Sequence, residues 1–387
     1  MILAPTRAAA LARLEAFVPH AARYAGRRNF DLGAGNHDGV SGLSPYIRTR
    51  LVTEDECTRA VLTQHSARAA EKFLQEIAWR TYWKGWLEMR PDVWRRYLET
   101  LAEQEKTTAY EAAVSGNTGI ACFDHWACEL LETGYLHNHA RMWFASIWIF
   151  TLKLPWQLGA DFFLRHLLDG DPAANTLSWR WVAGLHTPGK HYLARAENIA
   201  KFTNGRFDPK GQLHESAPPL PMDFVPERQP LLLPSDPAPR GRIGHLMFPD
   251  DLAPPPDRLG EITAIAAYIP PALETTPLVS SFLNSAVNDT LNRTSGSRLI
   301  EPFPSAIADW MSLEKLDSIV VSQPTVGFTH DFLDAQQFSF TPHFFVRDWD
   351  RKLWPHATAG FFKLKAALPK IHASIAPNRE DDLFPDF

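Results

Sequence analysis

Two aspartates, an asparagine and an arginine are the residues whose types and spacing could do chemistry. Asp169 and Asp171 flank one glycine in the stretch LLDGDPAANTLSWRW, and Asn175 follows four positions later. Upstream, the stretch TGYLHNHARM places Arg141 at the head of an almost wholly apolar run. Because an unpaired buried charge is costly, these groups need partners. The pattern predicts an Arg–Asp pair that braces two helices or, less favoured because HxxxH and HExxH spacings are absent, a metal site; we expect no metal.

Tryptophan is the unusual component of the composition. The chain has 13 tryptophans, and ten of them precede residue 182. Such side chains can stack on flat ligands or pass electrons, but at most positions we expect them to build a helical core. The ten are Trp79, Trp83, Trp86, Trp94, Trp126, Trp143, Trp148, Trp156, Trp179 and Trp181.

Residues 1–210 are predicted to be helical, because apolar residues recur there at helical spacing. Examples are KFLQEIAWRTYWKGWLEM and GADFFLRHLLDG. The run HARMWFASIWIFTLKL is apolar on nearly every side, which predicts a buried central helix. It is too short to span a membrane and is bracketed by Arg141 and Lys153, so we expect no membrane partner.

Proline concentrates in residues 211–260, which predicts a linker or an extended segment that wraps the helical part. Residues 261–387 alternate between β-rich and helical runs, which predicts a small α/β domain with a parallel sheet. The β-rich runs are EITAIAAYI, LDSIVVSQ and HFFVRDWD. The fold class is therefore predicted to be mainly α, and the sequence contains no GxGxxG or GxxxxGKS/T phosphate loop.

The composition, 45% apolar and 21% charged over 387 residues, excludes a largely disordered protein. The net charge of −5 argues against indiscriminate polyanion binding, although residues 1–210 hold 25 basic and 22 acidic residues against 14 and 22 in the remainder. An anionic partner is therefore expected to meet the first half. Three cysteines, Cys57, Cys122 and Cys128, are too few for a disulfide framework, so a reducing, cytoplasmic location is expected.

Five motifs, in order, resemble those of the photolyase/cryptochrome family. They are RYAGRRNF, SGLSPYI, FLQEIAWRTYW, TGYLHNHARM and LLDGDPAANTLSWRW, and the resemblance spans about residues 20–207. It implies that residues 1–210 are a helical domain that binds FAD. It also implies a set of residues that hold the cofactor: Tyr24, Ser41, Leu43, Ser44, Arg80, Arg141, Asp169, Asp171 and Asn175.

The resemblance gives several of these residues distinct roles. Asn175 resembles the amide that faces flavin N5, and Asp171 resembles the acceptor for the isoalloxazine edge or the ribityl arm. Asp169 resembles the carboxylate that pairs with Arg141. Residues 41–44 resemble a loop whose short side chains and N–H groups suit the FAD phosphates.

A second set of residues resembles the substrate pocket of the DNA-repairing members, in which a flipped pyrimidine dimer is bound by stacking. Glu76 would hydrogen-bond the bases and supply a proton. Two tryptophans would form the walls and a methionine a polarizable floor. The five residues are Glu76, Trp79, Asn138, Met142 and Trp181.

Electron supply is implied by the same resemblance. Trp179 and Trp156 resemble the inner and middle members of the family's photoreduction chain. The outer position falls near Glu103, which is no electron donor. Four residues remain as alternative outer donors: Trp94, Trp126, Trp148 and Tyr110.

The sequence departs from the family pattern in two places that bear on function. The arginine after Asn138 in the usual motif is His139, which removes a positive charge expected near a DNA phosphate. We also expect the family's N-terminal antenna-binding α/β domain to be missing and residues 261–387 to pack in its place. An unrelated appended domain is the alternative.

Three functions follow. The first is an FAD-dependent lyase that uses blue light and electron transfer from reduced flavin to split cyclobutane pyrimidine dimers in single- or double-stranded DNA. The second is a cryptochrome-like blue-light receptor with a signalling partner. The third is a flavin-binding protein with neither activity.

Overall fold

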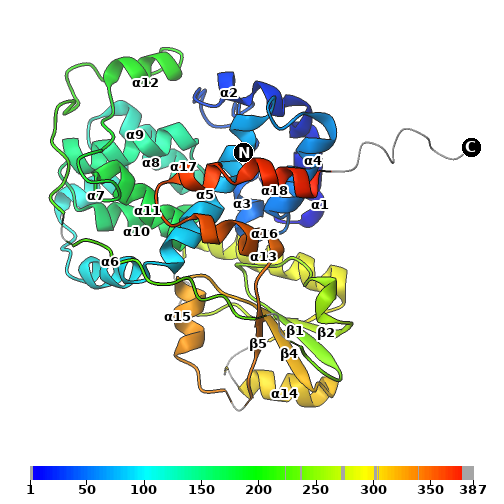
Figure 1. The fold of residues 1–387 in the computed structure, drawn as a ribbon. Helices are drawn as coiled ribbons and strands as arrows, with labels where there is room; N and C mark the ends of the chain where they lie inside the picture. Colours follow the sequence, from blue (N-terminus) through cyan, green and yellow to red (C-terminus); the bar gives the residue numbers. More distant parts are fainter. Residues whose placement is uncertain are drawn as a thin grey trace, which may run out of the picture.

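The computed structural model describes residues 3–222, 224–235, 238–271, 275–299, 303, 305–338 and 340–376. Helices build the first part of the chain, and a sheet with covering helices follows (Figure 1). Within the described residues, no helix is both long and apolar enough to cross a membrane. The helices of the first part are α1 (Arg7–Phe17), α2 (Tyr24–Arg27), α3 (Ser44–Arg48), α4 (Glu54–Gln64), α5 (Glu71–Glu88), α6 (Asp92–Ala102), α7 (Thr108–Val114), α8 (Ala121–Thr133), α9 (Asn138–Ser146), α10 (Trp156–His166), α11 (Pro172–Ala183) and α12 (Ala196–Phe202).

Large aromatic side chains fill the interior of this helical part. Trp126, Trp143, Trp148 and Trp179 are at most 2% exposed, as the sequence predicts for core residues. The predicted central helix is confirmed as α9, but it passes into a π-helical turn over Ile147–Thr151. Inside that turn, the indole N–H of Trp148 donates to the carbonyl oxygen of Pro155 at 2.9 Å, so this buried polar group has a partner.

Five parallel strands form one sheet in the order β3-β2-β1-β4-β5. The chain winds outward from β1 in one direction and then from β4 in the other, which is a doubly wound arrangement with its switch point between these two strands. The strands are β1 (Ile243–Met247), β2 (Ile262–Ala267), β3 (Ser297–Arg298), β4 (Ser318–Ser322) and β5 (His343–Phe345), and the connecting helices are α13 (Pro277–Thr294), α14 (Ser305–Glu314) and α15 (Phe328–Asp334).

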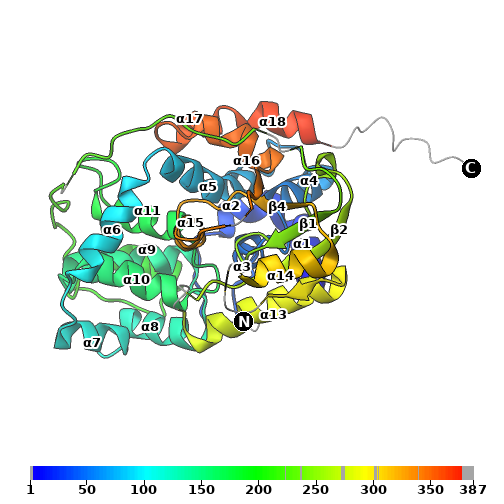
Figure 2. The ribbon, with the colours of Figure 1, turned by 90° about the horizontal axis from the view of Figure 1, so that it is seen from below.

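One face of the sheet packs against the helical part. Met247 and Ala267 belong to the same buried apolar cluster as the helical core, whereas the neighbouring Leu246 and Ala266 pack with Trp310 in a separate cluster. The connecting helix α13 contacts α1 and α10 (Figure 2). The parallel strands are therefore covered on both faces, which explains their continuous apolar runs.

Two domain boundaries differ from those predicted. The strand β1 lies inside residues 211–260, which were predicted to be a connector. The sequence did not reveal this strand because its run IGHLM is short, wholly buried and flanked by prolines. After β5 the chain leaves the sheet and packs on α5 and α4, so the end of the 261–387 segment joins the helical part. These returning helices are α16 (Asp348–Leu353), α17 (Phe361–Lys365) and α18 (Leu368–Ile375); residues 377–387 lie outside the described residues.

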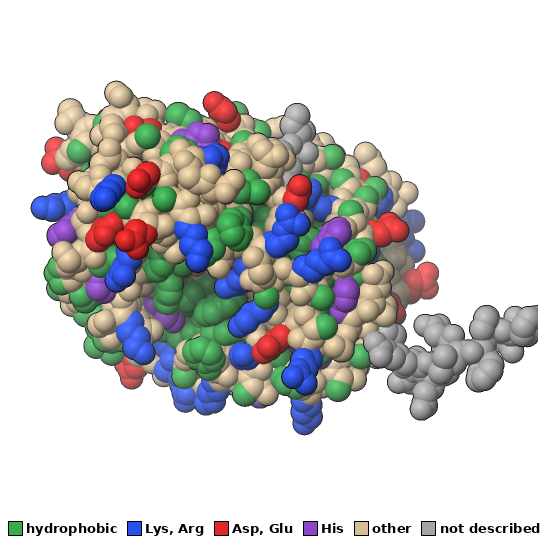
Figure 3. Space-filling view, turned by 90° about the horizontal axis from the view of Figure 1, so that it is seen from above, with side chains coloured by type: hydrophobic (Ala, Val, Ile, Leu, Met, Phe, Trp, Pro, Cys, Tyr) green, Lys and Arg blue, Asp and Glu red, His purple; other side chains and the backbone are tan. Residues whose placement is uncertain are grey.

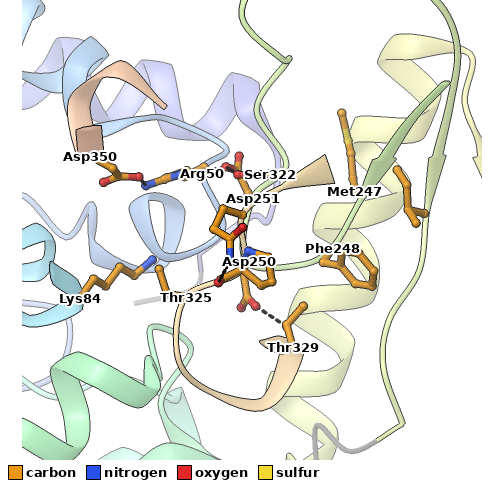
Figure 4. Close-up of a pocket in the computed structure, with 13 residues that line it drawn as sticks. Arg50, Lys84, Met247, Phe248, Asp250, Asp251, Ser322, Thr325, Thr329 and Asp350 are labelled. Atoms are coloured by element: carbon orange, nitrogen blue, oxygen red, sulfur yellow. Dashed lines mark hydrogen bonds and ion pairs between the residues drawn. The ribbon is translucent and has the colours of Figure 1, made fainter. Parts of the chain in front are cut away.

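Buried ion pairs join the helical part to Asp250 and Asp251, just after β1, and Ser322 at the end of β4 donates a hydrogen bond to Asp251 (Figure 4). Asp251 accepts hydrogen bonds from Arg347 Nε and Nη2, both at 2.6 Å, and from Arg50 Nη1 at 2.8 Å. Arg50 also pairs with Asp350, and its backbone is left-handed, with φ 53°. Open α/β sheets bind ligands at this switch point, but here the ion pairs leave about 20 Å³ of space.

A larger hollow of about 310 Å³ lies between the helical part and the helices that cover the sheet. Leucine, valine and phenylalanine make up half of its 12 lining residues, and charged groups lie at Arg48, Asp161 and Arg165. The contact between the two parts is therefore tight at the strand ends and open beside α10 and α13.

We expect Asp251→Asn to lower the free energy of unfolding by about 3–5 kcal/mol, because it leaves two buried guanidinium groups without their shared carboxylate. Burial alone would raise the pKa of Asp251, but Arg347 and Arg50 hold it well below its usual range. Its contribution is therefore present at neutral pH and is lost as the pH falls. Urea unfolding at neutral and acid pH measures both effects.

The matched control is Asp348→Asn, because Asp348 pairs with Arg258 at 2.8 Å but its side chain is 65% exposed. That change is expected to alter stability by less than about 1 kcal/mol. Equal losses in the two variants would contradict a special role for the buried cluster.

A second pH effect is expected at Glu88, whose carboxylate accepts from the backbone N–H of Val326 at 2.7 Å across the boundary. Burial raises the pKa of Glu88 from 4.5 to about 7. The folded state therefore binds a proton more tightly than the unfolded state, and stability falls as the pH rises through this window. Glu88→Gln should remove that pH dependence in urea unfolding curves, whereas Glu99→Gln, at an exposed position on α6, should keep it.

Candidate functional site

The charged residues that the sequence identifies meet at one place in the helical part. Arg141, in α9, binds both carboxylate oxygens of Asp169, at 3.0 and 3.1 Å. Asp169 is buried in the loop between α10 and α11. Burial alone would raise the pKa of Asp169, but Arg141, Arg80 and the hydroxyl of Ser44 hold it below its usual range. The predicted Arg–Asp pair is formed, and its carboxylate is ionised at neutral pH.

Asp171 is held by two cations from α5. Its Oδ1 caps α11 by accepting from the N–H of Ala174 at 2.8 Å, and its Oδ2 lies 3.6 Å from Arg80 Nη1 and 3.5 Å from Lys84 Nζ. Burial opposes ionisation, but Lys84 and Arg80 keep the pKa of Asp171 well below its usual range. Sequence reasoning missed Lys84, although its spacing of four from Arg80 puts both on one helical face.

Arg48 is a second residue that sequence reasoning missed. It is buried at the end of α3, and its Nε donates to the carbonyl oxygen of Gly170, between the two aspartates, at 2.6 Å. Its guanidinium also pairs with Asp250, just after β1. Arg48 therefore ties the 169–171 loop to the sheet, and only its place directly after the motif SGLSPYI could have drawn attention to it.

Asn175 lies on α11, one turn after Asp171, and is buried. Its Nδ2 donates to the carbonyl oxygen of Ala160 at 2.8 Å, which fixes the amide plane. The amide oxygen is then the end that can accept a hydrogen bond from a ligand.

The loop over residues 41–44 forms a tight turn beside a cation. The N–H of Leu43 donates to Ser41 Oγ at 3.3 Å, and Gly42 has a φ of 61°, which favours glycine. Arg13 Nε, from α1, donates to the carbonyl oxygen of Ser41 at 2.6 Å. A Cβ on Gly42 would lie 2.3 Å from Arg13 Nη2, so a larger residue at position 42 would displace the Arg13 guanidinium from its place beside the loop. Sequence reasoning did not identify Arg13.

Tyr24 and Glu76 share the cation of Arg28. Its Nη1 lies 2.6 Å from Glu76 Oε2, and its guanidinium carbon lies 5.9 Å from the centroid of the Tyr24 ring. Burial, followed by the charge of Glu76, raises the pKa of Tyr24, so the phenol is neutral. Burial also raises the pKa of Glu76, and Arg28 opposes that rise.

The residues predicted to bind bases are not core residues. Trp79, Met142 and Trp181 are partly exposed, and Asn138 is exposed at the first residue of α9. The ring of Trp181 stacks on that of Tyr192, with centroids 5.9 Å apart and an interplanar angle of 23°. On the face of the helical part opposite the sheet, Figure 3 shows a hollow lined by hydrophobic side chains and bordered by Lys and Arg.

His139, which occupies the position of an arginine in the family motif, points into the protein. It is buried, its Nδ1 lies 3.0 Å from the carbonyl oxygen of Asn29, and its ring stacks on Trp143 at 4.0 Å. Burial lowers the pKa of His139, so the ring is neutral at neutral pH. A nucleic-acid backbone would find no charge at this position.

The two tryptophans predicted to carry electrons lie on different lines of aromatic contacts. Trp179 contacts Trp148, with centroids 6.1 Å apart, and Trp148 contacts Tyr110 at 6.0 Å. Trp156 instead contacts Tyr97 at 5.6 Å. The two tryptophans therefore belong to two separate lines of buried aromatic side chains.

The groups around residues 169–175 fit FAD by their chemistry. Buried, ionised carboxylates and an oriented amide suit the polar edge of a flavin and its hydroxylated arm, and a tight loop beside Arg13 suits an anionic phosphate. Among the residues that the structure describes, those of this site included, no group of three or more His, Cys, Asp or Glu side chains is arranged to hold a metal ion.

Comparisons with known proteins agree with this site. Residues 73–216 match the family model of the FAD binding domain of DNA photolyase. A deoxyribodipyrimidine photo-lyase of Thermus thermophilus is 32% identical over 225 residues, which are 56% of this chain and 51% of the relative. The corresponding protein of Vibrio cholerae is 28% identical over 186 residues, 45% of this chain and 39% of the relative.

Among solved structures, a class III photolyase from Agrobacterium tumefaciens is 26% identical, with a TM-score of 0.45, over 51% of this chain and 43% of that chain. The chain thus spans about half, or less, of the length of the curated relatives that it matches. The family model, the curated relatives and the five ordered motifs agree that the helical part of this chain is similar to the FAD-binding domain of the photolyase/cryptochrome family.

Proposed function

We propose that this chain is an FAD-dependent lyase that splits cyclobutane pyrimidine dimers in DNA under blue light. The observation that carries the proposal is the buried pair of ionised carboxylates at Asp169 and Asp171, which are held by Arg141 and Lys84 and share Arg80. The same domain also presents partly exposed tryptophans and Glu76. Support also comes from curated relatives named deoxyribodipyrimidine photo-lyase.

When bound in its reduced form, FAD would absorb blue light and supply the electron that opens the dimer, and the electron would return to the flavin after the dimer has split. The chain's own task at the cofactor is to hold it and fix its charge environment. The 41–44 loop and Arg13 would face the phosphates, and Asn175 and Asp171 would face the flavin and its arm. The Asp169–Arg141 pair would keep a constant dipole beside them.

Three side chains would bind the flipped bases. Trp79 and Trp181 would stack on them, because any base offers a flat surface to an indole. Met142 would fill the space between, since a thioether adapts to irregular shapes. These contacts bury apolar surface and exclude water from the reacting bases.

Glu76 would hydrogen-bond the edge of the bases. One of its oxygens, Oε2, is engaged by Arg28 at 2.6 Å, so Oε1 is the atom that would accept a base N–H or hold a transferable proton. The exposed Asn138 would add a second polar contact at the start of α9.

We infer that electrons reach the cofactor through Trp156, the middle member of the route, and then through Trp179, the inner member. The line from Trp156 continues through Tyr97 to Trp94, whose indole N–H donates to Asp331 at 2.8 Å. A carboxylate beside an indole favours its oxidised, positively charged state. Of the candidates for the outer donor, Trp94 and Trp126 have this feature, since the indole N–H of Trp126 donates to Asp31 at 2.9 Å. Trp94 is the one of these two on the line from Trp156, while Tyr110 ends the line from Trp179 and Trp148.

A blue-light receptor is the second candidate function, and one contact favours it. Arg48 joins the carbonyl oxygen of Gly170, between the two aspartates, to Asp250 at the end of β1. A change of charge at the cofactor would therefore reach the sheet through a single side chain. Repair of a dimer-containing oligonucleotide by the reduced protein under blue light decides between the two: restored thymines support the lyase, and their absence with a light-dependent change in proteolysis supports the receptor.

We expect Asp169→Asn to weaken FAD binding by about tenfold or more, because it removes a bidentate, charge-assisted pair with Arg141. The measurement is the ratio of flavin to protein absorbance after purification and the dissociation constant of added FAD. Asp161→Asn, which removes a carboxylate paired with Arg165 at 2.8 Å, is the control and should keep its FAD. Equal FAD content in both variants would refute the assignment of Asp169.

We expect Glu76→Ala to weaken binding of a dimer-containing oligonucleotide by about tenfold, through loss of a hydrogen bond to a charged group. Splitting of the dimer under blue light should fall as well, while FAD content stays constant. Glu111→Ala, at an exposed position on α7, is the control. Unchanged binding and splitting in Glu76→Ala would show that this residue does not contact the bases.

A further inference from the structure

The ring of Trp79 is covered on one face by Phe361. Their centroids are 3.8 Å apart and their planes differ by 10°. Trp79 lies on α5 in the middle of the helical part, whereas Phe361 is the first residue of α17, in the segment that returns from the sheet. Phe361 is 6% exposed, while the neighbouring Phe362 is 81% exposed.

The backbone before Phe361 is fixed to the same helix that carries Trp79. The hydroxyl of Tyr82 donates to the carbonyl oxygen of Ala359 at 2.8 Å, and Arg90 Nη2 donates to that of Thr358 at 2.9 Å. Both donors lie on α5 or directly after it. The approach of the chain to Phe361 is therefore determined by α5 itself.

The other end of α17 is also attached to α5, through Lys365 and Glu71, whose charged atoms lie 3.0 Å apart. This pair is exposed and weak by itself, but it lies on the far side of Phe361 from the two backbone contacts. With the helix held at both ends, the Phe361 ring has little freedom to leave the indole.

We propose that Phe361 is a positioning residue of the base-binding pocket: its ring holds the Trp79 indole at the angle at which Trp79 stacks on a flipped pyrimidine. This inference rests on the proposed function. A side chain that is already ordered loses less entropy when it binds a ligand, so the stacked pair prepares one wall of the pocket before DNA arrives. The returning segment thereby contributes to a pocket built by the first part of the chain.

The first test needs no DNA. The full-length protein is labelled with fluorotryptophan, and the Trp79 resonance is assigned in fluorine NMR by its loss in Trp79→Phe. Phe361→Leu keeps apolar volume but removes the flat ring, so it should shift and broaden this resonance. Phe361→Tyr and the neighbouring Phe362→Leu should leave it unchanged. An unchanged resonance in Phe361→Leu would overturn the proposal whatever the protein's function.

The second test measures dissociation constants of the FAD-loaded protein in the dark for oligonucleotides with and without one thymine dimer. Phe361→Leu should weaken binding of the damaged strand about threefold to tenfold and leave the undamaged strand unchanged. Phe361→Tyr should keep the wild-type dissociation constant for the damaged strand. In a protein that already carries Trp79→Ala, Phe361→Leu should cause no further weakening.

Two results of the second test would overturn the proposal: equal affinities of the Phe361→Leu and Phe362→Leu variants, or equal weakening for both strands, which would indicate a structural role alone. A wild-type protein that does not distinguish the strands would instead refute the proposed function. In that case the NMR result alone decides whether Phe361 orients Trp79.

Discussion

Two buried carboxylates, separated in the sequence by a single glycine, constrain how the helices around them can pack. An isolated ionised carboxylate is too costly to keep inside a protein, so Asp169 and Asp171 require cations in fixed positions. The cations come from different helices: Arg141 from α9, and Arg80 and Lys84 from α5. These helices must pack so that the charges meet, and the loop between the aspartates is thereby held rigid where a cofactor would need it.

The same principle sets the boundary between the helical part and the sheet. Arg48 and Arg50 are two positions apart, and each crosses to an acid just after β1, Asp250 and Asp251 respectively. A sheet of this topology normally leaves its switch point open to a ligand. Here the charges occupy it, and the sheet is coupled directly to the loop at Gly170.

Sequence reasoning found the parts of the site that lie inside local patterns. The Arg141–Asp169 pair was predictable because both residues stand beside apolar runs that leave a charge no other place. Arg13, Lys84 and Arg48 were not, since their partners are set by tertiary packing and not by spacing. For the same reason, β1 was hidden between prolines, and the helices after β5 were assigned to the wrong neighbour, because a helical run does not reveal which surface it will cover.

The order of these segments along the chain has a consequence for synthesis. Domains generally fold from the N-terminus as they leave the ribosome. On α5, however, Trp79, Thr81 and Gly85 are contacted by Phe361, Trp349 and Trp354, which come near the end of the chain. The nascent helical bundle therefore emerges with an aromatic strip uncovered while the entire sheet is translated. An exposed aromatic surface of this kind can bind chaperones or self-associate during that interval. A chain whose synthesis stops early would keep this surface exposed and would be prone to aggregate.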